Sequence, residues 1–154
     1  MSLTTNKNFL SPNAFRLSID SQQFANVEYF CINSPLPSVS ATEVPTPFRN
    51  RQGSTPGEKA TFSPLDIRYM VSENMENYIE LFNWLIDNSQ SNTIQEYDII
   101  LNILNSSNNV NRQIRFADAY PTTLGSIDFH TQNTDVEYII GDVSFAYSHF
   151  EFIK

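Results

Sequence analysis

Apolar and polar residues alternate along several stretches of the chain, which is the pattern of strands that bury one face. In residues 14–20, Phe15, Leu17 and Ile19 share one face and polar side chains occupy the other. Residues 27–33 are apolar on nearly both faces, so this strand is expected to be more enclosed. Further strands are predicted over residues 60–71, 96–104, 112–120, 125–130 and 136–152.

The last predicted strand interrupts this alternation. In it, Phe150 and Phe152 fall out of step with Val143 and Phe145. A bulge near Ser148 and His149 would restore the alternation, because a bulge adds one residue to one strand.

A proline-rich segment follows the second predicted strand. Four prolines lie between Ser34 and Phe48, and each removes a backbone donor, which predicts an extended edge or connecting segment. Residues 49–58, RNRQGSTPGE, contain two arginines, two glycines and a proline, which predicts an exposed loop.

Only one segment has the period of a helix. In residues 75–88, MENYIELFNWLIDN, apolar residues recur at steps of three and four: Met75, Tyr78, Ile79, Phe82, Leu85 and Ile86. Ser72 or Asn74 can cap the start, and the polar residues 88–91 can end the helix. We expect Tyr78, Phe82, Leu85 and Ile86 to pack on the sheet, so Phe82→Ala should cost about 3–5 kcal/mol.

About seven or eight strands with one inserted helix indicate a mainly β protein. The predicted fold is a β-sandwich or barrel of antiparallel strands with the helix packed against it. At 154 residues the chain is most simply a single domain, residues 1–154.

Composition and charge narrow the functional class. A hydrophobic content of 40% with 13% aromatics is typical of a globular protein. The N-terminus lacks the pattern of a signal peptide, so synthesis in the cytoplasm is expected. A net charge of −8 argues against a protein that binds nucleic acid through its phosphates. The single cysteine, Cys31, excludes an internal disulfide and is interpreted as a small core residue.

No motif of catalysis or of cofactor binding stands out, so a non-enzyme without cofactor or metal is expected. His130 and His149 lie at predicted strand ends, where surface or core-edge roles are commoner than catalytic ones. Asp128 and His130 could mimic a base with its orienting residue, but no nucleophile signature accompanies them.

The stretch AYPTTLGSIDF, residues 119–129, is the most informative one in the chain. Pro121 fixes φ and should end the preceding strand, while Gly125 can take a positive φ and redirect the chain into the next strand. With the alternating IRFADA before it and the aromatic VSFAYSHFEF after it, this turn resembles the C-terminal part of tail tube proteins of contractile-tailed bacteriophages. The segments PNAFRLSI, YFCINSPLPSVSATEVPTPFRNRQ and SENMENYIELFNWL resemble successive parts of the same family, in the same order.

The resemblance implies a structural role. It implies subunits in homo-hexameric rings that stack into a tube inside a contractile sheath, in the tail of a virion. The partners would be the sheath, tape-measure and baseplate proteins, with DNA passing through the lumen without specific binding. The alternatives are a tube-initiator ring on the baseplate, the tube of a related contractile injection or type VI secretion system, and a small ligand-binding β-barrel.

The resemblance also assigns surfaces to residues of this chain. The segment around Arg49, Arg51 and Lys59 matches the family segment that reaches the next ring, so it is the expected inter-ring contact. The polar face of the helix, with Glu76, Asn77, Glu80, Asn83 and Asp87, is expected to look outward, which makes Glu80 and Asp87 sheath-facing. Polar strand positions are candidates for the lumen: Asp118, Asp128, Asp142 and Glu151.

Overall fold

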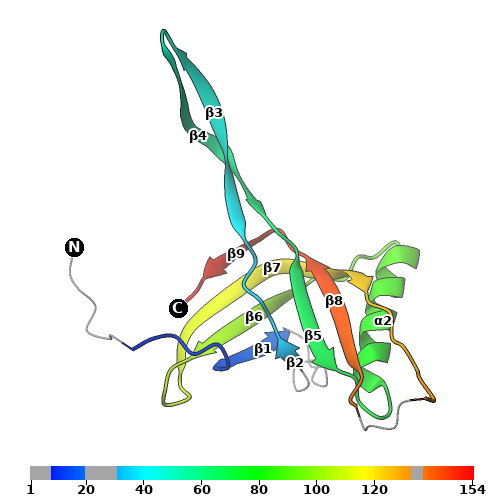
Figure 1. Cartoon of the computed structure of the whole chain (residues 1–154). Helices are drawn as coiled ribbons and strands as arrows, with labels where there is room; N and C mark the ends of the chain where they lie inside the picture. The colour runs from blue at the N-terminus through cyan, green and yellow to red at the C-terminus, as the bar shows by residue number, and fades with distance from the viewer. Residues whose placement is uncertain (1–7, 20–30, 133–136) are drawn as a thin grey trace.

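The computed structural model describes residues 8–19, 31–132 and 137–154. Within these ranges the chain forms nine strands and one helix (Figure 1). The elements in chain order are β1 (Phe15–Ile19), β2 (Cys31–Asn33), β3 (Val39–Phe48), β4 (Arg51–Phe62), β5 (Leu65–Met70), α2 (Glu76–Gln90), β6 (Tyr97–Leu104), β7 (Val110–Leu124), β8 (Ile140–Ala146) and β9 (His149–Phe152).

Seven of these strands form one antiparallel sheet that curls into a nearly closed barrel (Figure 1). The strand order is β1-β6-β7-β8-β5-β2, and β9 pairs with β7 beside β8. The remaining two strands, β3 and β4, form a separate hairpin. The predicted mainly β class with one inserted helix is confirmed, and its alternating strands are present at residues 15–19, 65–70 and 97–104.

The second predicted strand differs from the expectation. Residues 27–30 lie outside the described residues, and β2 is a short edge strand paired only with β5 among the described strands. Ile32 is 42% exposed, so the prediction of an enclosed strand is wrong for the part that the structure describes. An edge strand has one side open, and the apolar run alone does not reveal this.

The long strand β7 bends between two partners. Its first part pairs with β6 as far as Ala119, and its second part pairs with β8 from Tyr120 onward. At this bend Asp118 has a φ of 54°, in the left-handed region that aspartate tolerates better than most residues. The backbone of Asp118 therefore turns the strand around the corner of the barrel.

The predicted turn after Tyr120 is wrong in its details. Pro121 lies inside β7 opposite Phe145, where a register shift absorbs it, and the strand continues to Leu124. Gly125 does not have a positive φ. Its N–H donates to the carbonyl of Asp142 at 2.7 Å, and a Cβ atom there would lie 3.1 Å from the Asp142 Cβ. Because glycine has no Cβ atom, Gly125 allows the two backbones to approach closely, and a positive φ is not its role here.

Residues 125–130 are irregular, so the predicted strand there is wrong. The predicted bulge near Ser148 is instead a two-residue interruption between β8 and β9. Pairing keeps one register across it, with Tyr120 opposite Ala146 and Ala117 opposite His149. After this bend Phe150 packs against the core, which explains the change of phase in the sequence.

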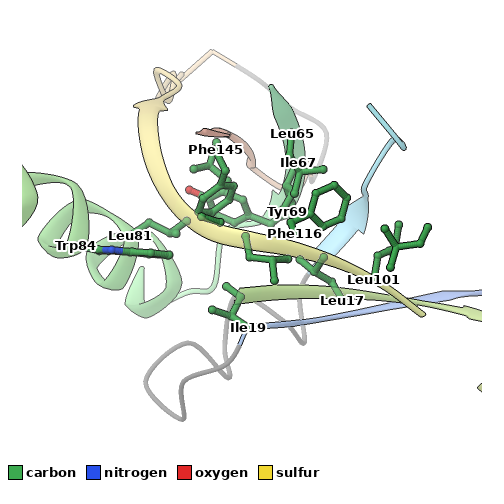
Figure 2. Close-up of a cluster of buried hydrophobic side chains, with 14 residues drawn as sticks. Leu17, Ile19, Leu65, Ile67, Tyr69, Leu81, Trp84, Leu101, Phe116 and Phe145 are labelled. Carbon is green, nitrogen blue, oxygen red and sulfur yellow. The ribbon is translucent and has the colours of Figure 1, made fainter. Parts of the chain in front are cut away.

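The interior of the barrel is filled by large apolar side chains (Figure 2). They come from β1, β5, β6, β7 and β8, and two come from α2: Leu17, Ile19, Leu65, Ile67, Tyr69, Leu81, Trp84, Ile99, Leu101, Ile114, Phe116, Ala119, Val143 and Phe145. The centre of the Trp84 ring lies 5.2 Å from the centre of the Tyr97 ring and 5.6 Å from that of the Phe145 ring. These aromatic contacts attach the helix to the barrel.

The helix is where the sequence predicts it, but its buried face is different. Asn77, Leu81 and Trp84 are buried, whereas Ile79 and Phe82 are 49% and 45% exposed. The buried amide of Asn77 is satisfied locally: its Nδ2 donates to the Met70 carbonyl at 2.7 Å, and its Oδ1 accepts from the backbone N–H of Tyr78 at 2.9 Å. The large loss in free energy of unfolding that the sequence predicts for Phe82→Ala is therefore expected for Trp84→Ala instead.

The start of the helix agrees in part with the prediction. The Ser72 hydroxyl accepts a hydrogen bond from the Glu76 N–H at 3.1 Å, while the N-cap position itself is held by Met75 with a φ of 56°. The helix ends at Gln90, inside the predicted polar run. In the described part of the chain, no helix has the length and apolar character needed to cross a bilayer.

Candidate assembly surface

The hairpin of β3 and β4 is the most conspicuous surface feature of the molecule. It leaves the barrel as a long arm, and its pairing runs from Val39 opposite Phe62 to Phe48 opposite Arg51 (Figure 1). The expectation of an exposed loop over residues 49–58 is thus half right: these residues are largely exposed, but all except the two-residue turn belong to strand β4. Both strands of an isolated hairpin are edge strands, which tolerate the prolines of this segment.

Exposed apolar side chains follow this arm. Val39, Val44 and Phe48 are 51%, 52% and 55% exposed, and the backbone of both strands is open along its outer edges. A two-stranded hairpin without a covering layer is marginally stable in water. An arm of 10 and 12 residues per strand therefore fits a contact with another molecule, which would cover it.

The tip of the arm combines an aromatic ring with positive charge. The guanidinium carbon of Arg51 lies 5.3 Å from the centre of the Phe48 ring, within the range of a cation–π contact. The same ring covers Gly53, where a Cβ atom would lie 2.4 Å from the ring edge. Arg49 stands in the turn between the strands. Phe48, Arg49 and Arg51 form what we call the hairpin tip.

Lys59, the third residue of the expected inter-ring contact, is not at the tip. It lies eight residues further along β4, where its carbonyl is 3.5 Å from the hydroxyl of Thr42. The structure thus brings Arg49 and Arg51 together and leaves Lys59 nearer to the barrel.

The base of the arm is fixed to the barrel by contacts that the sequence did not indicate. Tyr147 donates a hydrogen bond from its hydroxyl to the Ser63 carbonyl at 2.6 Å. The ring of Phe62 packs edge-on against the rings of Tyr147 and Phe150, at 6.2 and 5.2 Å between centres. Burial raises the pKa of Tyr147 above its ordinary value. These contacts fix the direction in which the arm leaves the barrel.

Of the four candidate lumen acids, two are ion-paired with an arginine and two are not, among the described residues. Asp142 on β8 is 3.1 Å from the Nε of Arg68 on β5, and Glu151 on β9 is ion-paired with Arg115 on β7. Asp118 and Asp128 are exposed and form no ion pair within the described residues. Two of the four acids are therefore already partly neutralised by a neighbouring strand.

The two candidate sheath-facing acids differ from each other. Asp87 is exposed on α2, as expected, whereas Glu80 is half-buried. Asn77, expected on the same outward face, is fully buried. The exposed face of the helix instead carries Glu76, Ile79, Phe82, Asn83 and Asp87.

The remaining reactive side chains are dispersed. His130 lies in the irregular segment after β7, and the exposed His149 lies at the start of β9 with its Nδ1 3.1 Å from the Ser148 hydroxyl. Burial raises the pKa of Cys31 to about 11, which favours the unreactive thiol. Among the described residues, no group of three or more histidine, cysteine or acidic residues is close enough to hold a metal ion.

Comparison with known proteins relates the chain to a phage tail protein. No protein-family model matches the chain. The sequence of this chain is 22% identical to that of the tail tube terminator protein of Enterobacteria phage T4 over 132 residues. The matched region covers 78% of this chain and 74% of the phage protein.

Two solved structures are similar over nearly the whole chain. The sheath/tube terminator of the PVC extracellular contractile injection system, in its extended state, has a TM-score of 0.73 at 16% identity and covers 98% of this chain and 100% of its own. The tube-terminating cap of the anti-feeding prophage has a TM-score of 0.72 at 14% identity, with 98% and 95% covered. The fold is thus that of tube-type proteins, and the predicted resemblance to tube proteins of contractile tails is confirmed.

Proposed function

We propose that this chain is a structural component of the tube of a contractile tail or injection system, and that it acts as a tube terminator. The observation that carries the proposal is the similarity to a terminator of known sequence and to two terminators of known structure, over most of each chain. The resemblance seen in the sequence favours the main tube subunit instead. That role remains the alternative, because the tube-type fold is compatible with both.

In this proposal six copies form a ring around a central channel, and the ring stands at the end of a tube inside its sheath. The exposed arm of β3 and β4 supports an assembling role, since it offers open strand edges and exposed apolar side chains to a neighbour. Sheath, tape-measure and baseplate proteins are the proposed further partners, in a virion or a related particle made in the cytoplasm.

The barrel itself supports a structural role over a ligand-binding one. Its interior is filled by the side chains of the core, including Phe116, Phe145 and Tyr69, all fully buried (Figure 2). A small ligand-binding barrel needs an internal cavity, which this packing occupies. The chain is therefore proposed to be a non-enzymatic subunit.

The proposal is tested first by negative-stain microscopy of the purified protein at increasing concentration. Rings with a central hole are the expected result. Particles that stay monomeric or dimeric, both alone and with the tube protein of the same particle, would contradict it.

Deletion of the gene in the source system separates the two roles. Loss of the main tube subunit abolishes tubes, whereas loss of a terminator leaves tubes that form but are not closed at one end. Electron micrographs of the particles, with complementation by the intact gene as the control, distinguish these outcomes. We expect tubes of altered length or with open ends.

A further inference from the structure

A pocket of about 530 Å³ lies at the end of β5 that is farthest from the arm. One wall is the connection from β5 to α2, with Met70, Val71 and Met75. The opposite wall consists of residues before and after the segment 133–136, with Phe129 and Tyr138. The two walls are joined by the hydrogen bond from the Val71 N–H to the Ile139 carbonyl at 2.9 Å.

The lining is suited to an apolar side chain with positive charge beside it. Phe129 and Tyr138 are 72% and 75% exposed, so two aromatic rings at this pocket have no covering partner within the described chain. Among the described residues that line the pocket, the charged ones are Glu73 and Glu137, and both are exposed. Such a site would accept an aromatic or aliphatic side chain flanked by cations.

The hairpin tip has the complementary chemistry. Phe48 is 55% exposed, the guanidinium of Arg51 lies over its ring, and Arg49 follows it in the turn. Between Pro45 and Thr55 the arm carries these two arginines and no acid. The hairpin tip thus combines a partly exposed aromatic ring with two positive charges, in a protein whose net charge is −8.

The turn of the arm and the last residue of β5, where the pocket begins, lie at opposite ends of the molecule (Figure 1). Ser63 and Pro64 connect the arm to Leu65, the first residue of β5. The pocket begins at Met70, the last residue of that strand. A chain therefore cannot place its own tip in its own pocket. The two surfaces can be satisfied together only between different molecules.

We propose that the pocket of one copy of this chain receives the hairpin tip of a second copy. Phe48 enters between Met75, Phe129 and Tyr138, and Arg49 and Arg51 lie next to Glu73 and Glu137. The contact is heterologous, so it closes into a ring or continues as a stack, depending on the rotation between copies. This inference rests on the proposed function, because it takes the chain to be an assembling subunit, and it names the surface that receives the arm.

Charge reversal on each surface provides the test. One variant carries Arg49→Glu with Arg51→Glu, and the other carries Glu73→Lys with Glu137→Lys. Each variant alone opposes like charges at the contact, so its apparent association constant should fall at least about tenfold. Size-exclusion chromatography with light scattering at low and high salt measures the association, and circular dichroism confirms that each variant is folded.

Mixing the two variants is the decisive step. An acidic tip meets a basic pocket and a basic tip meets an acidic pocket, so the mixture should recover the association that each variant lost. A chain that carries all four reversals should also associate with itself. Phe48→Ala should weaken association at any salt concentration, whereas Asn111→Ala, on an exposed position of β7, serves as the control and should not.

Three outcomes would overturn the inference. The variants could associate as the wild type does, the mixture could fail to recover association, or the wild type could stay monomeric at all concentrations. The proposed function fails separately. Rings of the wild type in micrographs, together with unaffected charge variants, would leave the tube component standing and remove only this contact.

Discussion

The carboxylate of Asp98 accepts a hydrogen bond from the backbone N–H of Asp118 at 3.1 Å, at the corner where β7 leaves β6 and joins β8. Asp118 has a φ of 54° at this point. The polar side chain on one strand thus supports the strained backbone of the next, and the barrel curves around this contact.

This corner gives the first prediction. Asp118→Val should lower the free energy of unfolding by about 1–2 kcal/mol, because a β-branched residue is strongly disfavoured in the left-handed region. Asp118→Gly should be close to neutral, since glycine adopts this φ without strain. Urea denaturation of both variants measures the difference. Asn111→Val, at an exposed position of the same strand, is the control; an equal loss there would contradict the role of the backbone angle.

A second prediction concerns the face of the helix. Trp84 is 2% exposed and lies between Tyr97 and Phe145, so Trp84→Ala should cost about 3–5 kcal/mol. Phe82 is 45% exposed, so Phe82→Ala should cost less than about 1 kcal/mol. Chemical denaturation of the two variants tests the orientation directly. The reverse order would mean that the helix packs through the stripe that the sequence pattern suggests.

The same helix illustrates what a sequence pattern can and cannot predict. Its existence and its ends follow from the 3.6-residue period and from the polar residues after it. The predicted buried face is wrong, because the apolar stripe leaves out Leu81 and Trp84 and the pattern counts Asn77 as a surface residue. In the structure the Asn77 amide is paired with the backbone at Met70 and Tyr78, and a satisfied polar group can be buried at little cost.

The candidate site was harder to predict than the barrel. Strands β1, β5 and β6 alternate because one face meets the core, whereas β3 and β4 have no core to face and show no such alternation. Resemblance to a family marked Arg49 and Arg51 as a contact surface. The pairing that puts them at the tip of an arm depends on cross-strand hydrogen bonds that leave no periodic signal in the sequence.

A third prediction concerns alkaline pH. The Tyr69 hydroxyl is fully buried, with no hydrogen-bond partner among the described groups, and burial raises its pKa from 10.0 to about 12. Between these values the unfolded chain releases the phenol proton while the folded chain keeps it. The free energy of unfolding should therefore fall as the pH rises from about 10 to about 12.

Tyr69→Phe tests this explanation. The variant should be as stable as the wild type at pH 7 or slightly more stable, because it removes a buried hydroxyl without a partner. Its stability should also decline less steeply above pH 10. Urea midpoints at pH 7, 9, 10 and 11 measure both effects, with Tyr138→Phe, on a side chain that is 75% exposed, as the control for the loss of one tyrosine. An unchanged pH slope in Tyr69→Phe would assign the decline to other groups.

The last prediction concerns the proposed channel. Asp118 and Asp128 are exposed and form no ion pair within the described residues, whereas Asp142 and Glu151 face Arg68 and Arg115. If these acids line the lumen, the first two carry most of the repulsion toward DNA, because the other two are partly neutralised. We therefore expect Asp118→Lys with Asp128→Lys to slow DNA passage more than Asp142→Asn with Glu151→Gln.

The double variant Asp118→Asn with Asp128→Asn separates lost repulsion from new attraction, and its passage rate should lie between those of the wild type and the lysine variant. The rate of DNA ejection is measured at several salt concentrations, after microscopy has confirmed normal particles. Slowing by the lysine variant should be strongest at low salt, where the range of the charge is longest, since the Debye length is about 30 Å at 0.01 M and about 8 Å at 0.15 M. Equal ejection rates for all variants at every salt concentration would mean that these carboxylates do not act on passing DNA, and a salt-independent delay would point to a steric effect of the lysine side chains instead.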